Sequence, residues 1–189
     1  MKVIFLDIDG VLNSEHWYVK NHEKHPERCR SDRCIDPRFV RNLSKIVKKT
    51  GAKIVLTATI RGVVKKRADH YLHEIFKRYG LSIYDYTSKC NSVMRGYEIQ
   101  DWLDRHRDVT NIVIIDDEDD MVHLSKYLVQ TLSWPYIKID DESVVRNKSM
   151  FAWITEGLNY KAVRKAIKIL KKPYVNQYAV KDVMYRKTF

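Results

Sequence analysis

Three short apolar runs in this chain each end in a polar residue, and patterns typical of amphipathic helices separate them. The runs with their polar successors are residues 3–6 before Asp7, residues 54–56 before Thr57, and residues 112–115 before Asp116. Runs this short suit strands that are buried on both faces. The alternation predicts an α/β fold in which helices cover both faces of a mainly parallel sheet, and ligands bind beyond the carboxyl ends of its strands.

The intervals between the runs carry the helical patterns. Residues 35–51 are expected to form a helix with Asp36 as N-cap, Pro37 in the first turn and Gly51 at its end. Further helices are expected over about 68–79, around 99–103, near 121–128, and over 159–172. Two additional short strands are expected, at residues 81–84 and, as an edge strand, at 136–139.

The 189 residues, 44% of them hydrophobic, suffice for one sizeable core. We therefore expect a single domain over residues 1–172, followed by a C-terminal extension over 173–189. Neither an apolar run long enough to span a membrane nor a signal peptide is present, so we expect a cytoplasmic protein without a membrane partner. The sequence does not specify an oligomeric state.

The chain has three cysteines, Cys29, Cys34 and Cys90. An odd, widely spaced set argues against a disulfide framework and for free thiols in a reducing compartment. Cys29 and Cys34 follow several histidines, but their spacing does not match a pair of zinc-ligand hairpins, so we expect a polar loop there instead of a zinc site.

The formal net charge of +11 is large for this length. It fits either a polyanionic partner or a solvated lysine-rich surface, and charge alone does not decide between them.

Two carboxylates follow the first apolar run, in the order Asp7-Ile8-Asp9-Gly10-Val11-Leu12. At this point the chain resembles the haloacid dehalogenase-like (HAD) superfamily, whose phosphatases open with Asp-x-Asp-Gly followed by a small β-branched residue and Leu. The resemblance implies that Asp7 is a nucleophile forming an aspartyl-phosphate and that Asp9 is the general acid and base. Gly10 allows the tight turn that brings substrate close to the backbone.

A cation is needed because a carboxylate at about 4 Å from a phosphate dianion is repelled by about 4 kcal/mol per charge pair at an effective dielectric near 20. Mg²⁺ prefers carboxylates, phosphate oxygens and water. The acidic stretch at residues 116–120 resembles the family's fourth motif and implies, in order of preference, Asp116, Asp117 and Asp120 as ligands. Asp7 and Asp9 are expected to complete the magnesium site.

The second motif implied by the resemblance is the hydroxyl of Thr57, which would hydrogen-bond the transferring phosphoryl group. Related small phosphatases continue with further hydroxyls, a tryptophan and an arginine; this chain keeps the arginine as Arg61 but has Ala58, at a substrate-contact position, in place of the middle hydroxyl and Ile60 in place of the tryptophan. Arg61 is expected to bind substrate phosphate through its planar guanidinium, or else to be an ordinary solvated arginine.

The third motif is a cation that neutralises the nucleophile, and both Arg95 and Lys89 are candidates. Arg95 is preferred because it begins residues 95–103, which resemble the Arg-Gly-x-Glu-Ile-x-x-Trp-Leu stretch of a HAD subgroup associated with RNA repair proteins. Residues 156–158 resemble a later element of that subgroup, which extends the resemblance over about residues 1–172.

The resemblance implies a three-layer Rossmann-like sandwich without a full cap domain, because neither of the intervals that usually hold a cap is long enough. Residues 14–34 are expected to form at most a small lid or a substrate loop. The site is therefore expected to be open to solvent.

The activity expected is a Mg²⁺-dependent phosphomonoesterase, acting on nucleotides or on phosphorylated nucleic-acid ends. Basic residues near the site favour the nucleic-acid end, and they include Arg41, Lys45, Lys65, Lys66 and Arg67. Two alternatives stay open: a non-catalytic nucleic-acid-binding module on a HAD fold, and a phosphatase of small sugar or polyol phosphates.

Overall fold

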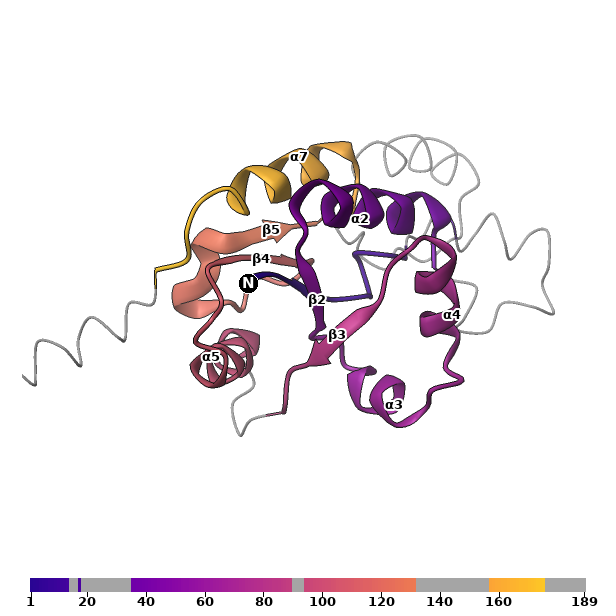
Figure 1. The fold of residues 1–189 in the computed structure, drawn as a ribbon, viewed down its shortest axis with the longest axis horizontal. Coiled ribbons are helices and arrows are strands. Elements are labelled where there is room, and N and C mark those ends of the chain that lie inside the picture. Colours follow the sequence, from indigo (N-terminus) through magenta and orange to yellow (C-terminus); the bar gives the residue numbers. More distant parts are fainter. Residues whose placement is uncertain (14–16, 18–34, 90–93, 132–156, 176–189) are drawn as a thin grey trace, which may run out of the picture.

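The computed structural model describes residues 1–13, 17, 35–89, 94–131 and 157–175. Its centre is a sheet of five strands in the order β3-β2-β1-β4-β5 (Figure 1). The strands are β1 (Lys2–Leu6), β2 (Lys53–Leu56), β3 (Ile83–Tyr86), β4 (Asn111–Asp116) and β5 (Leu128–Gln130). All four pairings between neighbouring strands are parallel, which confirms the predicted α/β class.

Helices cover both faces of this sheet (Figure 1). On one face α2 (Pro37–Thr50) and α7 (Tyr160–Ile169) pack side by side, and the other face carries α5 (Arg95–Arg105) and the 3₁₀ helix η3 (Val122–Tyr127). Two short helices, α3 (Arg61–Lys66) and α4 (Tyr71–Arg78), lie near the β3 edge (Figure 1). The three-layer arrangement is the one expected from the sequence.

Two hydrophobic clusters fill the space between the layers, and β1 contributes to both. Ile4 and Leu6 pack on the α2 and α7 side, whereas Val3 and Phe5 pack against α5, where the Phe5 ring meets the edge of Trp102. Side chains alternate between the faces of a strand, so a run of four apolar residues serves both clusters. The central strand is thereby fixed, and Asp7 emerges at its carboxyl end.

The helix α2 begins and ends as its sequence predicts. The side chain of Asp36 accepts a hydrogen bond from the backbone N–H of Arg38, and Gly51 ends the helix with a φ of 68°. Both features satisfy backbone groups that a helix end leaves without partners.

Three predicted elements differ in the structure. The strand expected at residues 81–84 is shifted by two positions and forms β3 at Ile83–Tyr86. The helix expected from residue 68 begins at Tyr71 after the N-cap His70, and the separate helix α3 precedes it. Leu128, expected in a helix, instead starts β5, because the buried Leu128 and Val129 pair with β4. The apolar spacing of 121–128 was compatible with a helix but belongs to a 3₁₀ turn that runs into a strand.

Several predictions lie outside the described residues. These are the edge strand at 136–139, nearly all of the lid at 14–34, the tail from residue 176, and the three cysteines. The start of the C-terminal extension is described: Tyr174 N–H donates to Thr110 O at 2.7 Å, so this part lies against the end of the sheet. In the described part of the chain, no helix combines the length and apolar character needed to cross a membrane.

Candidate active site

The polar residues that follow three of the strands are held together by backbone hydrogen bonds. Asp7 N–H donates to Ile115 O at 3.0 Å, and Thr57 N–H donates to Leu6 O at 2.9 Å. These bonds continue the parallel ladders one residue beyond β1 and β2. The backbone therefore holds the ends of β1, β2 and β4 side by side, where the sequence predicts a site.

Three carboxylates meet at this edge. One oxygen each from Asp7, Asp116 and Asp117 lies within 4.8 Å of the others. Two members are buried, with Asp7 5% exposed and Asp116 fully buried, and Asp117 is half-buried. Negative charges this close together in a poorly solvated place repel one another strongly, so a bound cation would stabilise the ionised carboxylates.

Arg95 supplies part of that positive charge. Its Nη1 lies 2.5 Å from Asp7 Oδ1 and 3.0 Å from Asp116 Oδ2. Because Arg95 is the first residue of α5, its backbone is also fixed: its N–H donates to Asp120 Oδ2 at 2.9 Å. Of the two candidates for the third motif, Arg95 is the one in contact with the proposed nucleophile.

The single positive charge of Arg95 does not balance the negative charges of the three carboxylates. Burial, together with the charge of Asp7, raises the pKa of Asp116 from 3.8 to about 7 despite the opposing effect of Arg95. Burial also raises the pKa of Asp7, and Arg95 only partly opposes this shift. A divalent cation would reverse both effects by stabilising the ionised forms.

The donor set fits such a cation. Asp116 Oδ2 is buried without a well-aligned hydrogen-bond donor, although Arg95 Nη1 is only 3.0 Å away. Asp120 Oδ1 is likewise buried without a partner, but Asp120 is outside the three-carboxylate cluster, and its other oxygen receives the Arg95 N–H. Oxygen ligands of this kind suit Mg²⁺. Of the five carboxylates expected as metal ligands, Asp7, Asp116 and Asp117 form the cluster. Asp9 and Asp120 lie outside it.

Asp9 lies in the exposed turn after β1. Its Oδ1 accepts a hydrogen bond from Asn13 Nδ2 at 2.7 Å, while Asn13 Oδ1 accepts from Gly10 N–H at 2.7 Å. The turn thus holds the Asp9 carboxylate at its surface, in reach of solvent. That placement suits a group that exchanges protons with water and substrate.

Gly10 is fixed in place by its conformation and by its neighbour. Its φ is +68°, and a Cβ atom there would collide with the carboxylate of Asp117. The Gly10 carbonyl also accepts a hydrogen bond from Thr131 Oγ1 at 2.9 Å, just beyond β5. The glycine therefore lets the first motif approach the acidic residues closely, in addition to allowing the turn.

Thr57 and Ala58 are buried at the end of β2. The Thr57 hydroxyl has no hydrogen-bond partner in the described part of the protein, which leaves it available as a donor. Ala58 is 1% exposed and its carbonyl accepts from Arg61 N–H at 2.9 Å. This position therefore shapes the loop after β2 through its backbone.

The structure places Arg61 inside the protein. Its guanidinium donates to three backbone carbonyls, those of Thr57, Ala58 and Thr87, at 2.8–3.1 Å. It also forms a buried ion pair with Glu98 at 2.7 Å. Because its donors are engaged with the protein, Arg61 joins the loops after β2 and β3 to α5.

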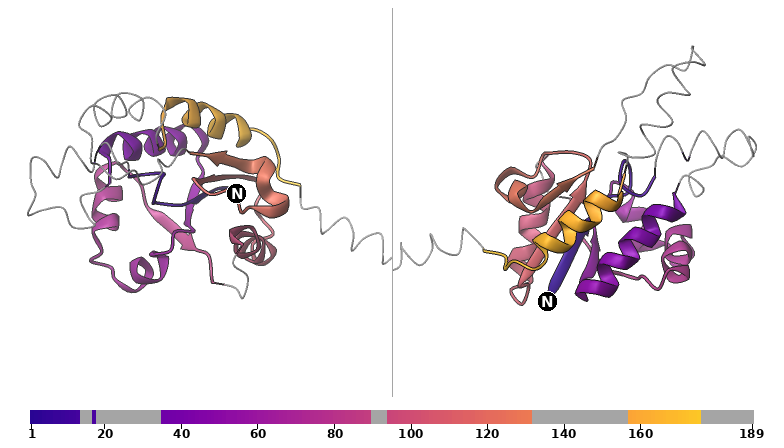
Figure 2. Two further views of the ribbon diagram at one scale, coloured as in Figure 1. Left: turned by 180° about the vertical axis from the view of Figure 1, so that it is seen from behind. Right: turned by 90° about the horizontal axis from the view of Figure 1, so that it is seen from above.

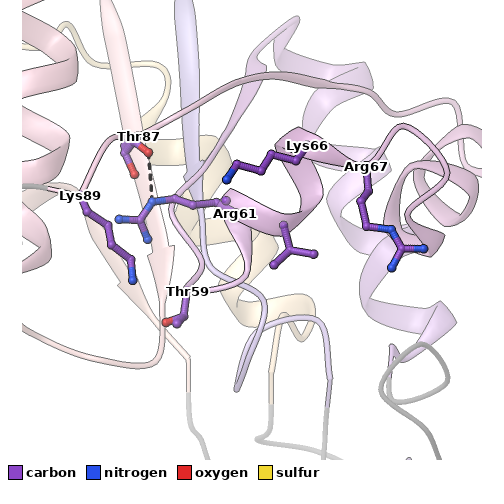
Figure 3. Close-up of a pocket in the computed structure, with 8 residues that line it drawn as sticks. Thr59, Arg61, Lys66, Arg67, Thr87 and Lys89 are labelled. Carbon is purple, nitrogen blue, oxygen red and sulfur yellow. Dashed lines mark hydrogen bonds between the residues drawn. The ribbon is translucent and has the colours of Figure 1, made fainter.

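A pocket of about 460 Å³ opens beside this arginine, between α3 and the ends of β2 and β3 (Figure 3). Lys66, Lys89 and Thr59 line it, together with Arg61 and Thr87. Neither Lys66 nor Lys89 is in an ion pair with a described residue. Lys89, the alternative cation for the third motif, thus lies in a neighbouring pocket, away from the contacts that Arg95 makes.

Two residues at the site had no role in the sequence analysis. Glu98 pairs with Arg61, and Asn13 holds Asp9. Asn13 lies four residues after Asp9, and this spacing permits such a bond in a helical turn. The sequence spacing alone could therefore have suggested Asn13 as the partner of Asp9. The partner of Arg61 is 37 positions away, and only the fold brings the two together.

A model of the family described as the HAD domain in Swiss Army Knife RNA repair proteins matches residues 3–141. This range includes β2 to β5, all of β1 except Lys2, and every candidate site residue discussed above. No curated protein matches the chain significantly.

Proposed function

The chain belongs to the family of HAD domains in Swiss Army Knife RNA repair proteins, a family within a hydrolase superfamily, and on this premise we propose that it is a Mg²⁺-dependent phosphomonoesterase. The observation that carries the proposal is the contact of Arg95 with both Asp7 and Asp116, with the third carboxylate of Asp117 close by. A nucleophile, its counter-charge and a metal-ligand set are thereby combined in one buried cluster.

In the first step, the Asp7 carboxylate attacks phosphorus and the bond from phosphorus to the leaving oxygen breaks. Arg95 donates to Asp7 Oδ1, while Oδ2 has no hydrogen-bond donor in the described part of the chain and is the attacking atom. Asp9, in its protonated form, gives its proton to the leaving oxygen. The product alcohol leaves, and an aspartyl-phosphate remains on Asp7.

In the second step, water attacks the phosphorus of this intermediate. Asp9 now accepts the proton of the water, and the bond from phosphorus to the Asp7 oxygen breaks. Inorganic phosphate is released and both carboxylates return to their starting states. The Thr57 hydroxyl, which has no hydrogen-bond partner among the described residues, donates to a phosphoryl oxygen during both steps.

Asp7, Asp116 and Asp117 would hold the Mg²⁺ ion. When bound, the ion supplies positive charge that offsets the repulsion between carboxylate and phosphate. Asp120 contributes indirectly, because its side chain accepts a hydrogen bond from the backbone N–H of Arg95 and so fixes the position of that residue.

Nucleotides and phosphorylated nucleic-acid ends are the substrate classes that we propose. The pocket beside Arg61 supports this choice because Lys66 and Lys89, which line it, would favour further anionic groups of a substrate. A substrate held only by its single phosphate would leave these two cations without partners.

The proposal is tested with the full chain in Mg²⁺, by measuring phosphate release from a panel of phosphomonoesters. The panel contains oligonucleotides with a 3′- or a 5′-phosphate, mononucleotides and sugar phosphates. Asp7→Asn is expected to abolish release, whereas Asp119→Asn is the matched control at an exposed position of the acidic stretch.

Each outcome of the panel discriminates between functions. Release that depends on Asp7 but is fastest with sugar phosphates would overturn the nucleic-acid substrate and retain the enzyme. Absence of any release that depends on Asp7 would overturn the enzyme and favour a non-catalytic module.

A further inference from the structure

The net positive charge of this protein is concentrated on one surface formed by α2 and α7. Four exposed cations lie on α2, namely Arg41, Lys45, Lys48 and Lys49. Four more lie on α7, namely Lys161, Arg164, Lys165 and Lys168. Lys171 and Lys172 follow directly and are also exposed. We call these ten residues the basic helix surface.

The charge count shows how uneven the distribution is. Ten of the 35 lysine and arginine residues are in this surface, which leaves 25 for the rest of the chain against 24 aspartate and glutamate residues. The remainder of the protein is therefore almost neutral, and these ten cations account for nearly all of the formal net charge of +11. A general adaptation for solubility would not require such segregation.

The two helices carry no opposing charge. Neither the α2 sequence nor the α7 sequence contains an acidic residue. No ion pair joins any of the ten cations to an acidic residue in the described part of the structure. Acidic residues one turn away on the same helix can pair with surface lysines, and no described residue neutralises this surface in that way.

Tertiary structure unites the two halves of the surface. The helices are separated by more than 100 positions in sequence, yet they pack side by side on the same face of the sheet (Figure 2). On each helix the cations recur at intervals of three and four residues, and Lys48–Lys49 and Arg164–Lys165 are adjacent pairs, so all of them lie on the solvent side of the helix. From Arg41 to Lys49 the stripe spans about 12 Å at 1.5 Å per residue.

We propose that the basic helix surface binds the phosphate backbone of a nucleic acid. Two adjacent stripes of cations, none of them in an ion pair with a described residue, complement a chain of regularly spaced phosphates. A lipid surface is a poorer fit, because the apolar residues of both helices, such as Leu43 and Ala166, are buried against the sheet and leave nothing to insert into a bilayer.

The surface begins next to the candidate active site. The backbone N–H of Asp36, which caps α2, donates to Leu12 O at 2.8 Å, and Leu158 N–H, just before α7, donates to Val11 O at 2.9 Å. Both helices therefore start at the turn that follows Asp9. A strand bound along them has its end beside this turn, and this last step rests on the proposed phosphatase function.

The experiment measures binding of a short fluorescent RNA duplex to the full chain over a range of salt concentrations. The variant Lys45→Glu/Arg164→Glu changes one cation on each helix. The matched control Lys77→Glu/Arg78→Glu makes the same change in net charge at exposed positions of α4. Thermal unfolding of all three proteins checks that the fold is retained.

Wild type is expected to bind with a steep salt dependence. The surface variant should lose affinity on the order of tenfold at low salt, and the slope of log affinity against log salt should fall by about 2. The control should keep the wild-type slope. Hydrolysis of a small phosphomonoester should be the same in all three proteins, so loss of RNA binding is distinguished from failure of the phosphatase proposal.

Three results would overturn the inference. Equal losses in both variants would show that only the overall charge matters, and a flat salt dependence of the wild type would show that phosphates are not contacted. Binding to phosphatidylserine vesicles, without binding to RNA, would assign the surface to a membrane instead.

Discussion

Arg61 and Glu98 form an ion pair of 2.7 Å in which the side chains are only 7% and 12% exposed. The pair joins the start of α3 to α5, the helix that begins with Arg95. An arginine that was expected to bind substrate phosphate thus has its donors engaged within the protein. Its contribution to the site is to hold the elements that carry Thr57 and Arg95.

Substitution of Arg61 by alanine is therefore expected to destabilise the protein. It would remove the guanidinium donors from the buried Glu98 carboxylate and from the carbonyls of Thr57 and Thr87, at a cost of about 3–5 kcal/mol in the free energy of unfolding. Urea unfolding measures this loss. Arg67→Ala is the control, since its ion pair with Asp69 is exposed and should leave stability unchanged. A stable Arg61→Ala protein with only a raised KM would restore the direct phosphate-binding role.

Gly10 and Gly51 offer a matched comparison, because both have a φ of +68°. Alanine at either position should cost about 1–2 kcal/mol of stability through the backbone conformation. Only at Gly10 would the new Cβ displace the Asp117 carboxylate, since nothing lies within 4 Å at Gly51. Calorimetry should show that Gly10→Ala weakens Mg²⁺ binding and Gly51→Ala does not. Equal Mg²⁺ affinities would argue against Asp117 as a ligand.

The raised pKa of Asp116 predicts a particular pH dependence of stability in the metal-free protein. Between pH 3.8 and about 7, the folded state holds a proton on Asp116 that the unfolded state has released, so this residue makes the protein less stable as the pH rises. The upper bound is about 4 kcal/mol at about 1.4 kcal/mol per pH unit.

The test compares the free energy of unfolding of wild type and Asp116→Asn from pH 4 to pH 8 in a chelator. The stability of wild type relative to the variant should fall over this range, and Mg²⁺ should restore it at pH 8. A difference that does not change with pH would contradict the buried, proton-binding state of Asp116.

Kinetic measurements on variants distinguish Arg95 from Lys89 as the cation of the third motif. Removing Arg95, which contacts both Asp7 and Asp116, is expected to lower kcat by about 100-fold or more, a loss typical of a missing charge-stabilising donor. Lys89→Ala should leave kcat for a small phosphomonoester nearly unchanged and raise KM for a substrate with further phosphates. A large fall in kcat for Lys89→Ala alone would assign the third motif to Lys89.

Local sequence patterns predicted the three central strands of the sheet and the edge at which the candidate site lies. Short apolar runs followed by Asp7, Thr57 and Asp116 specify buried parallel strands and what lies at their ends, because parallel strands place their carboxyl ends together. The residues that cap α2 could likewise be recognised from positions close to them in the sequence. These features depend on neighbours in sequence, so the sequence alone is sufficient to predict them.

Features that depend on distant partners were not predictable in this way. The same arginine after β2 fits a phosphate ligand or a structural clamp, and only the position of Glu98 in the fold decides where its guanidinium goes. Leu128 has helical spacing relative to its neighbours, yet pairing with β4 makes it the start of a strand. Tertiary contacts overrode the local pattern at both positions.

The most direct test of the account is detection of phosphate on Asp7. A single turnover is quenched in acid, and the protein is reduced with borohydride and digested for peptide mass spectrometry. Reduction of an acyl-phosphate at Asp7, seen in wild type and absent from Asp7→Asn, is the predicted result. Substrate turnover with no modified Asp7, or with a modification that persists in Asp7→Asn, would contradict Asp7 as the nucleophile.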